Sequence, residues 1–164
     1  MSLVEQLIRR KEDRGLMATL RCYLVESKRH RAWPALHRLG IPVGSEAPDA
    51  LAASTVAALF ATHPEATSSG NMGDHCRHLE KLRGEKSGDD SKMTPTERRF
   101  QILLAADRGE IHERVARIVR MAKQQGISIN YAQLLTDLKY WNDRTRNTWA
   151  SRFWSPNAQE QEDA

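Results

Sequence analysis

Apolar residues recur along this chain at the three- and four-residue spacing of amphipathic helices. One stripe is formed by Ile111, Val115, Ile118, Val119 and Ala122. Gly126 marks the end of this helix, and a second stripe runs from Tyr131 to Trp141. No segment alternates apolar and polar residues as a half-buried strand does. The pattern therefore predicts an all-α fold, a compact bundle of roughly seven to nine short helices packed at mixed angles.

Helix-start signals stand in front of several of these stripes. Ser2 and Glu5 have the spacing of a capping box, in which each side chain bonds the other residue's backbone N–H. Thr94 and Glu97 repeat that spacing. Asn142 has the side chain of an N-cap and is expected to begin the last helix.

Polar segments suggest how the chain is divided. Residues 84–93 have almost no apolar content, which is typical of a flexible connector. We expect a single helical domain over residues 1–154, in which this connector allows two lobes, 1–83 and 94–154. Residues 155–164 form an acidic tail that we expect to be disordered.

The size and composition fit a self-sufficient globular domain. A chain of 164 residues buries roughly 70% of its unfolded surface, so it needs neither a disulfide nor a metal to fold. Its two cysteines do not make a disulfide framework. No apolar run approaches the ~20 residues of a membrane-spanning helix, and the first residues lack the pattern of a signal peptide. We expect a soluble, cytoplasmic protein with no membrane partner.

The charge is distributed in blocks. Residues 1–44 carry nine Lys and Arg against four acids, and residues 95–154 carry eleven against six. The segment between them and the last ten residues are each acidic overall. Arginine makes up 18 of the 25 cations, and its planar fork suits phosphate. Two arginine-rich blocks favour a polyanion partner, and a merely solvated helical surface is the alternative.

Catalytic and metal-binding patterns are not found. Asp74, His75, Cys76 and His78 are potential metal ligands that stand close together in the sequence. A zinc site normally takes its four ligands as two pairs, and the sequence has no CxxC or HxxxH pair to supply the second. No glycine-rich phosphate loop and no pair of nucleophile and base can be recognised. We therefore expect no catalytic residues, no metal and no cofactor, and hence a protein that is not an enzyme.

Aromatic residues are concentrated near the C-terminus, where six of the ten lie between Tyr131 and Trp154. Trp141, Trp149 and Phe153 stand at apolar helical spacing, which is typical of core residues. Base stacking is the alternative role for such rings. The spacing favours the core.

Three arginine clusters remain as candidate binding groups. They are Arg98 and Arg99 with Arg108; Arg114, Arg117 and Arg120; and Arg144 with Arg146. Arginines three apart on a helix face one way, and N–H groups at helix starts would add donors for phosphate. For the middle cluster, a solvated face paired with Glu110 and Glu113 is the alternative.

The residues around these clusters resemble a known family. Glu97 to Arg108, ERRFQILLAADR, resembles the central signature of the CasB family, the small subunit of the type I-E CRISPR surveillance complex Cascade. Residues 34–40 resemble the family's segment of Pro, Ala, two aromatics, Arg and Leu. Residues 134–146 resemble its Leu-rich helix, tryptophan and closely spaced basic residues. The three segments follow in the family's order and span nearly the whole chain.

The resemblance implies an all-α, non-enzymatic protein of antiviral defence. It would bind nucleic acid without reading sequence and stabilise the R-loop and the displaced non-target strand. Implied partners are other Cascade subunits, crRNA, target DNA and a second copy of the chain. The implied contact residues are Arg21, Arg38, Arg99, Arg108, Arg117, Arg144 and Arg146, with Arg98 added from its cluster.

Two other functions fit part of the pattern. The turn at Gly126 between two helices could belong to a helix-turn-helix transcriptional regulator, although the segment after it, Ile127 to Tyr131, is largely apolar. The arginine-rich faces would also suit an adaptor that binds acidic protein.

Overall fold

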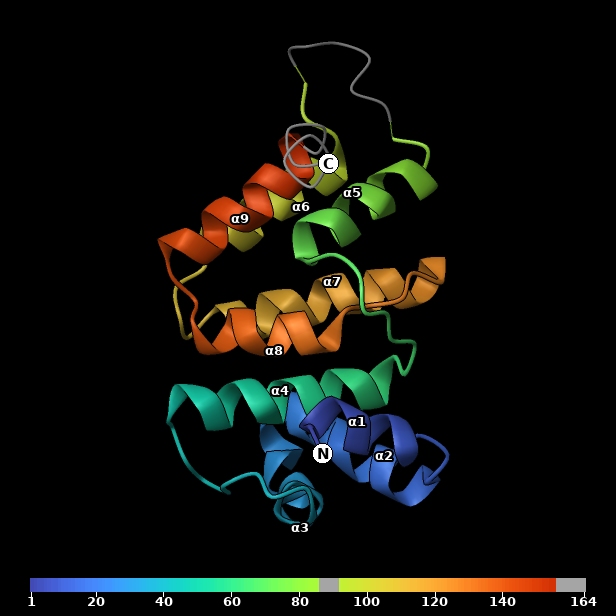
Figure 1. Ribbon diagram of the computed structural model, residues 1–164, viewed down its shortest axis with the longest axis vertical. Coiled ribbons are helices and arrows are strands. Elements are labelled where there is room, and N and C mark those ends of the chain that lie inside the picture. The colour runs from blue at the N-terminus through green and yellow to red at the C-terminus, as the bar shows by residue number, and fades with distance from the viewer. Residues whose placement is uncertain (86–91, 156–164) are drawn as a thin grey trace. The chain divides into compact units, whose positions relative to one another are not determined.

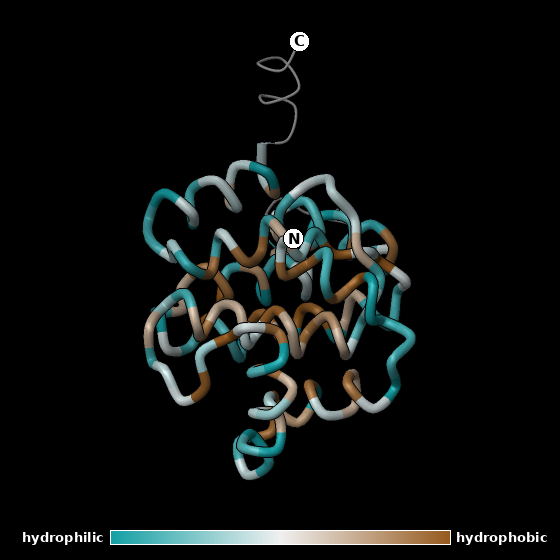
Figure 2. Tube along the Cα trace, turned by 60° about the horizontal axis from the view of Figure 1, so that its bottom comes forward, coloured by the Kyte–Doolittle hydropathy of each residue, from teal (hydrophilic) through white to brown (hydrophobic). Residues whose placement is uncertain are grey.

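The computed structural model describes residues 1–85 and 92–155 (Figure 1). These residues form nine α-helices and two 3₁₀ helices, with no β-sheet, which confirms the all-α prediction. Apolar and polar positions alternate in short runs along the helices, as Figure 2 shows. Helices such as α2 (Arg14–Arg21), α5 (Met72–Leu82) and α7 (Ile111–Gln125) thus have an apolar side available for packing.

The described chain divides into two compact units. The first unit is Met1–Ser68 with Tyr131–Tyr140, and the second is Ser69–Asn130 with the segment that begins at Trp141. Helix α8 therefore belongs to the first unit although it lies far along the chain.

The first unit is built around α4 (Pro48–Thr62). Its other helices are α1 (Leu3–Arg9), α2 (Arg14–Arg21), the 3₁₀ helices η1 (Cys22–Leu24) and η2 (Glu26–Ala32), α3 (Trp33–Arg38) and α8 (Tyr131–Lys139). Helix α4 is buried on nearly every side and packs against α8, α2 and α1. Figure 1 shows α8 lying alongside α4. Small Ala, Ser and Thr side chains on α4 allow these close approaches.

Tyr131 fixes the start of α8 against the end of α4. Its hydroxyl donates to the carbonyl oxygens of His63 at 2.5 Å and Leu59 at 3.3 Å. Its ring meets Phe60 edge-on with the centroids 5.5 Å apart. Burial raises the pKa of this hydroxyl. The tyrosine thus adds hydrogen bonds from α8 to carbonyls at the end of α4, where Leu59 O also accepts from His63 N.

The second unit contains α5 (Met72–Leu82), α6 (Pro95–Leu104), α7 (Ile111–Gln125) and α9 (Asp143–Trp154). Trp141 and Trp149 pack with ring centroids 4.8 Å apart, and Phe100 stacks on Phe153 at 4.6 Å. All four side chains are buried. The predicted core role of Trp141, Trp149 and Phe153 is confirmed.

The predicted helix starts are present. Ser2 with Glu5 and Thr94 with Glu97 form reciprocal capping boxes, and Asn142 accepts from the backbone N–H of Thr145 at 3.1 Å. Gly126 closes α7 in the left-handed region, with φ of 69°, where a side chain would be strained. These boundaries are local, so neighbouring residues suffice to predict them.

The chain divides between Ser68 and Ser69, whereas the sequence allowed two lobes separated by residues 84–93. Residues 86–91 of that connector and 156–164 of the predicted acidic tail lie outside the described residues. The flexible connector and the disordered tail therefore stay predictions. None of the described helices combines the length and the apolar character needed to cross a membrane.

Candidate nucleic-acid interface

The eight candidate arginines are shared between the two units. Arg21 and Arg38 lie in the first unit. The second unit holds Arg98, Arg99, Arg108, Arg117, Arg144 and Arg146. All eight are exposed except Arg146, which is half-buried. The first turn of α9 contains Arg144 and Arg146.

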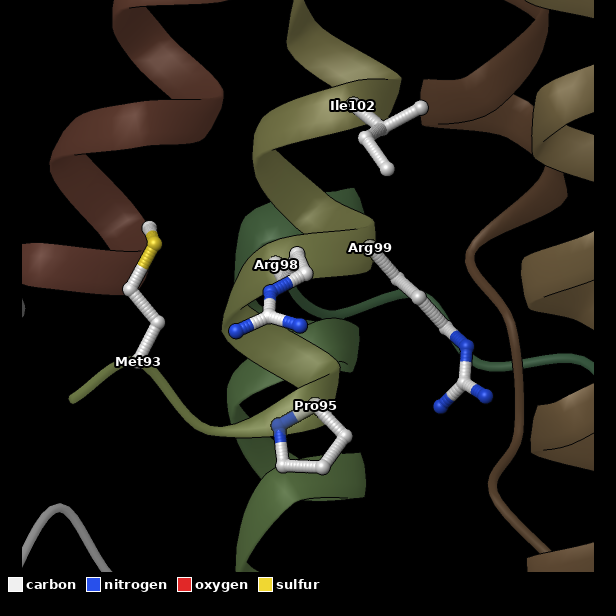
Figure 3. A pocket seen from close by; sticks show the side chains of 5 residues that line it. All are labelled: Met93, Pro95, Arg98, Arg99 and Ile102. Carbon is white, nitrogen blue, oxygen red and sulfur yellow. The ribbon is translucent and has the colours of Figure 1, made fainter.

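Arg98 and Arg99 extend from the first turns of α6 (Figure 3). Together with Met93, Pro95 and Ile102 they line a shallow hollow of about 210 Å³. Neither guanidinium forms an ion pair or hydrogen bond with a described residue. Two cations beside an apolar hollow can hold a phosphate and leave room for a sugar or base.

The backbone at the start of α6 is already occupied. Thr96 N donates to Glu85 Oε2 at 3.1 Å, and Glu97 N donates to Thr94 Oγ1 at 3.1 Å. Thr94 Oγ1 also donates to Glu80 Oε2 at 2.5 Å. The expectation that this helix start supplies N–H donors for phosphate is therefore wrong, because side chains of the protein take those donors. Any phosphate contact here falls to the two arginines.

Most of the hydrogen-bond donors of the Arg146 guanidinium bond other groups of the protein. Its Nε donates to Leu104 O at 2.9 Å and its Nη2 to Ala106 O at 2.9 Å. Its Nη1 pairs with Asp143 Oδ1 at 3.0 Å, and its guanidinium lies 5.0 Å from the Trp141 ring centroid. A cation at these carbonyls also complements the negative end of the α6 dipole. The structure thus gives Arg146 a structural role, which sequence spacing did not show.

The middle cluster is partly neutralised. Arg114 Nη1 donates to Ile102 O at 2.6 Å, and its guanidinium pairs with Glu110. Arg117 Nη2 pairs with Glu113 Oε1 at 3.2 Å, with both side chains more than half exposed. The predicted alternative of a helix face paired with glutamates is confirmed for these two residues. Because an exposed pair of this kind is worth little, Arg117 can exchange its partner for a phosphate.

The contacts of Arg146 join the backbone segments that carry Arg108 and Arg144. Arg108 follows Ala106 by two residues, and Arg144 precedes Arg146 by two residues. Since Arg146 bonds Ala106 O, the loop after α6 and the start of α9 touch. Both Arg108 and Arg144 are exposed and unpaired within the part of the chain that the structure describes.

In the first unit, Arg21 donates from Nη1 to Ala61 O at 3.0 Å, and Arg38 stands exposed at the end of α3. Sequence reasoning missed three further exposed cations of this unit, Lys28, Arg29 and Arg31. The signal was present as the run KRHR at positions 28–31, which lies outside the three segments that resemble the family.

Among the potential metal ligands of α5, His75 and Cys76 are buried and Asp74 caps the start of the helix, whereas His78 is exposed. His75 is buried, and its Nε2 accepts from Asn130 N at 3.0 Å. Burial lowers the pKa of His75 to about 4 and raises the pKa of the Cys76 thiol. Over residues 1–85 and 92–155, no three His, Cys, Asp or Glu side chains are placed to hold a metal ion.

The chain is similar to CRISPR-associated proteins. A family model described as CRISPR-associated protein Cse2 matches residues 16–154. A CRISPR-associated protein of the Cse2 family from Thermus thermophilus is 23% identical with a TM-score of 0.71, over 93% of each chain. No curated protein sequence matches significantly.

Two CasB crystal structures are similar as well. CasB from Thermus thermophilus is 23% identical with a TM-score of 0.66, over 94% of this chain and 99% of that one. CasB from M. ruber is 22% identical with a TM-score of 0.67, over 100% of this chain and 99% of that one. At these identities the likeness shows a shared fold.

Proposed function

Because this chain belongs to the CRISPR-associated Cse2 family, we propose that it is the non-enzymatic small subunit of a type I-E Cascade complex. In this role it works in the cytoplasm with other Cascade subunits, crRNA and target DNA, and it pairs with a second copy of itself. It binds nucleic acid without reading sequence and stabilises the R-loop through the displaced non-target strand.

One observation in the second unit carries this proposal. Arg98, Arg99, Arg108 and Arg144 are exposed, and no described carboxylate neutralises them. An arginine without an internal partner keeps its whole fork for phosphate oxygens. Contacts made only to phosphates do not depend on base identity. Such a surface suits a strand whose sequence changes with every target.

The energetics of R-loop formation make weak contacts sufficient. The RNA–DNA heteroduplex that forms is about as stable as the DNA duplex it replaces. Modest binding of the displaced strand can therefore shift the equilibrium from the DNA duplex toward the R-loop. Each phosphate contact to single-stranded DNA contributes about −0.7 to the slope of log affinity against log salt concentration.

The experiment replaces Arg98, Arg99, Arg108 and Arg144 together by Gln, which removes the charge and keeps the length. A matched control replaces four other exposed cations by Gln, and so it removes the same amount of positive charge. These are Arg9, Arg10, Lys11 and Arg14. Affinity for labelled single strands of unrelated sequence is measured by fluorescence anisotropy over a salt series. R-loop formation is measured in complexes assembled with the other Cascade subunits.

We expect the four-residue variant to lose affinity and to flatten the salt slope by about 3 if all four residues contact phosphate. R-loops formed with it should dissociate faster, and the control should stay close to the natural protein. If the variant and the control behave alike in both assays, the second-unit arginines are not the binding surface.

No observation favours the helix-turn-helix regulator. Helix α8 would be its recognition helix, but Tyr131, Leu134 and Leu138 bury it in the first unit. Binding to one palindromic duplex site, rather than to any single strand, would support the helix-turn-helix regulator instead. The same salt series tests the adaptor alternative, under which single strands should bind only weakly.

A further inference from the structure

The first unit carries an exposed basic and aromatic surface, of which only Arg38 is among the eight candidate arginines. We call it the η2–α3 strip, and it consists of Lys28, Arg29, His30, Arg31, Trp33, His37 and Arg38. Every one of these side chains is exposed. The buried residues of the same segment are Ala32, Ala35 and Leu36, so the strip is the solvent side of η2 and α3.

The aromatic side of the strip is centred on Trp33. This indole is 44% exposed, whereas Trp141 and Trp149 are buried in the core. The His30 ring stands edge-on to it, with centroids 6.5 Å apart and planes at 79°. His37 follows Trp33 by one helical turn and so lies on the same side of α3. A tryptophan left this open offers a flat apolar face to a partner.

The cations of the strip lack carboxylate partners. Between positions 14 and 45 the chain has six Lys and Arg residues and one acid, Glu26. No described carboxylate forms an ion pair with Lys28, Arg29 or Arg31. This local excess accounts for most of the basic character of the N-terminal block.

Arg29 is fixed in place without being neutralised. Its Nε donates to Tyr23 O at 3.0 Å, and its guanidinium lies 4.8 Å from the Tyr23 ring centroid. A guanidinium held over a ring loses less conformational freedom when it binds an anion. Its two Nη groups make no hydrogen bond to a described residue and remain available for a phosphate.

We propose that the η2–α3 strip is a second site for single-stranded nucleic acid, where a base stacks on Trp33 and Lys28, Arg29 and Arg31 hold the neighbouring phosphates. Single-strand binding surfaces combine these two elements, a cationic track and rings on which bases stack. An acidic peptide would use the cations and leave the indole without a partner. The ring therefore favours nucleic acid over acidic protein.

The site extends the proposed function but does not depend on the second-unit arginines. It differs in kind, because those arginines contact phosphates alone whereas Trp33 contacts a base. Binding at Trp33 is therefore sensitive to the presence of bases and insensitive to their order, since every base has a flat face.

The test compares two probes of equal length and charge, a labelled single-stranded oligonucleotide and its abasic counterpart, by fluorescence anisotropy with the full chain. We expect Trp33→Ala to weaken binding of the normal strand by about 5- to 150-fold, the range for loss of one stacked base. Binding of the abasic strand should be unchanged. Trp33→Phe keeps a ring and should restore much of the affinity.

Two controls accompany these variants. Tyr140→Ala removes another aromatic side chain of the first unit, which is 61% exposed, and should not change binding. Far-UV circular dichroism of each variant checks that the fold is kept. Replacing Lys28 and Arg31 by Gln should weaken both probes alike and reduce the salt slope by about 0.7 for each lost contact.

Three results would overturn the proposal. One is an unchanged affinity of Trp33→Ala for the normal strand. Another is an equal loss for the normal and abasic strands, which would make the strip purely electrostatic. The third is displacement of the single strand by polyglutamate with the same dependence on Trp33, which would indicate a protein-binding surface. Because the second-unit variant is assayed in parallel, failure here and failure of the proposed function are told apart.

Discussion

At the scale of single residues, arginines that look alike in the sequence have different surroundings in the structure. Arg144 and Arg146 are two positions apart in one helix turn. Arg146 is bonded to two backbone carbonyls, a carboxylate and a ring, whereas Arg144 is exposed and unpaired among the described residues. Substitution of the two should therefore separate folding from binding.

Arg146→Ala is expected to destabilise the fold, and Arg144→Ala is not. The first removes hydrogen bonds to Leu104 O and Ala106 O, which should cost about 1–3 kcal/mol. The second changes an exposed side chain, for which effects stay within about 0.5 kcal/mol. Urea unfolding followed by circular dichroism measures both. Equal midpoints for the two variants would contradict the structural role of Arg146.

A buried histidine predicts acid sensitivity. Burial lowers the pKa of His75 to about 4, against an ordinary value of 6.5. As the pH falls from 6.5 to 4, His75 becomes protonated in the unfolded chain but stays largely neutral in the folded chain. The folded state therefore loses stability relative to the unfolded state over this range. The loss from this group should reach on the order of 3 kcal/mol by pH 4. Urea unfolding at stepped pH values measures it.

His75→Gln isolates the contribution of this group. Glutamine still offers an acceptor to Asn130 N but does not titrate, so the variant should lose less stability over the same pH window. Carboxylates titrate in both proteins and cancel in the difference. His37→Gln, which removes an exposed histidine of the first unit, is the matched control. Parallel curves for the natural protein and His75→Gln would count against the buried neutral state.

At the scale of helices, a close approach in the second unit is made possible by a glycine. A Cβ built on Gly73 would stand 2.1 Å from the backbone oxygen of Trp149. That oxygen belongs to α9, and α5 and α9 pack extensively. Any side chain at position 73 must push the two helices apart.

Gly73→Ala should destabilise the protein by about 1–3 kcal/mol or more, because the added methyl group meets backbone that cannot move aside. Gly15→Ala is the matched control. Gly15 lies in the first turn of α2, where a Cβ finds its nearest neighbour at 3.6 Å. That variant should be neutral or more stable by up to ~1 kcal/mol. Thermal unfolding of both variants provides the comparison, and a stable Gly73→Ala would mean that α5 and α9 are not in close contact.

At the scale of the molecule, the first unit depends on a helix from the C-terminal half. Helix α8 packs along α4, and Tyr131 bonds the carbonyls of Leu59 and His63. Without α8, apolar surface of α4 would be left in water at a cost of about 25 cal/mol per Å². We therefore expect that the N-terminal residues do not fold by themselves as a domain.

A fragment of residues 1–83 is accordingly expected to have low helix content and no cooperative thermal transition. Addition of a synthetic peptide of residues 129–142 should increase the ellipticity above the sum of the two parts. The same peptide with Leu134→Asp and Leu138→Asp should not, because both leucines are buried. Cooperative unfolding of the fragment alone would show that α8 is dispensable.

The sequence by itself determined the helices of this protein. Capping boxes at Ser2 and Thr94, the stop at Gly126 and the apolar stripes all depend on residues within a few positions of one another. Such short-range patterns can be read without knowing what the helix packs against. The core role of Trp141, Trp149 and Phe153 followed from the same spacing.

Only the tertiary structure decided where α8 belongs and which arginines are free. Both depend on contacts between residues about 40 to 70 positions apart, such as Arg146 with Leu104 and Tyr131 with His63. A sequence shows how many cations a helix carries. It does not show that a backbone carbonyl brought near by folding can accept the N–H groups of a guanidinium, which are then not available for a phosphate. Net charge therefore favoured a polyanion partner, and only the folded contacts showed that Arg146 is held by the carbonyls of Leu104 and Ala106.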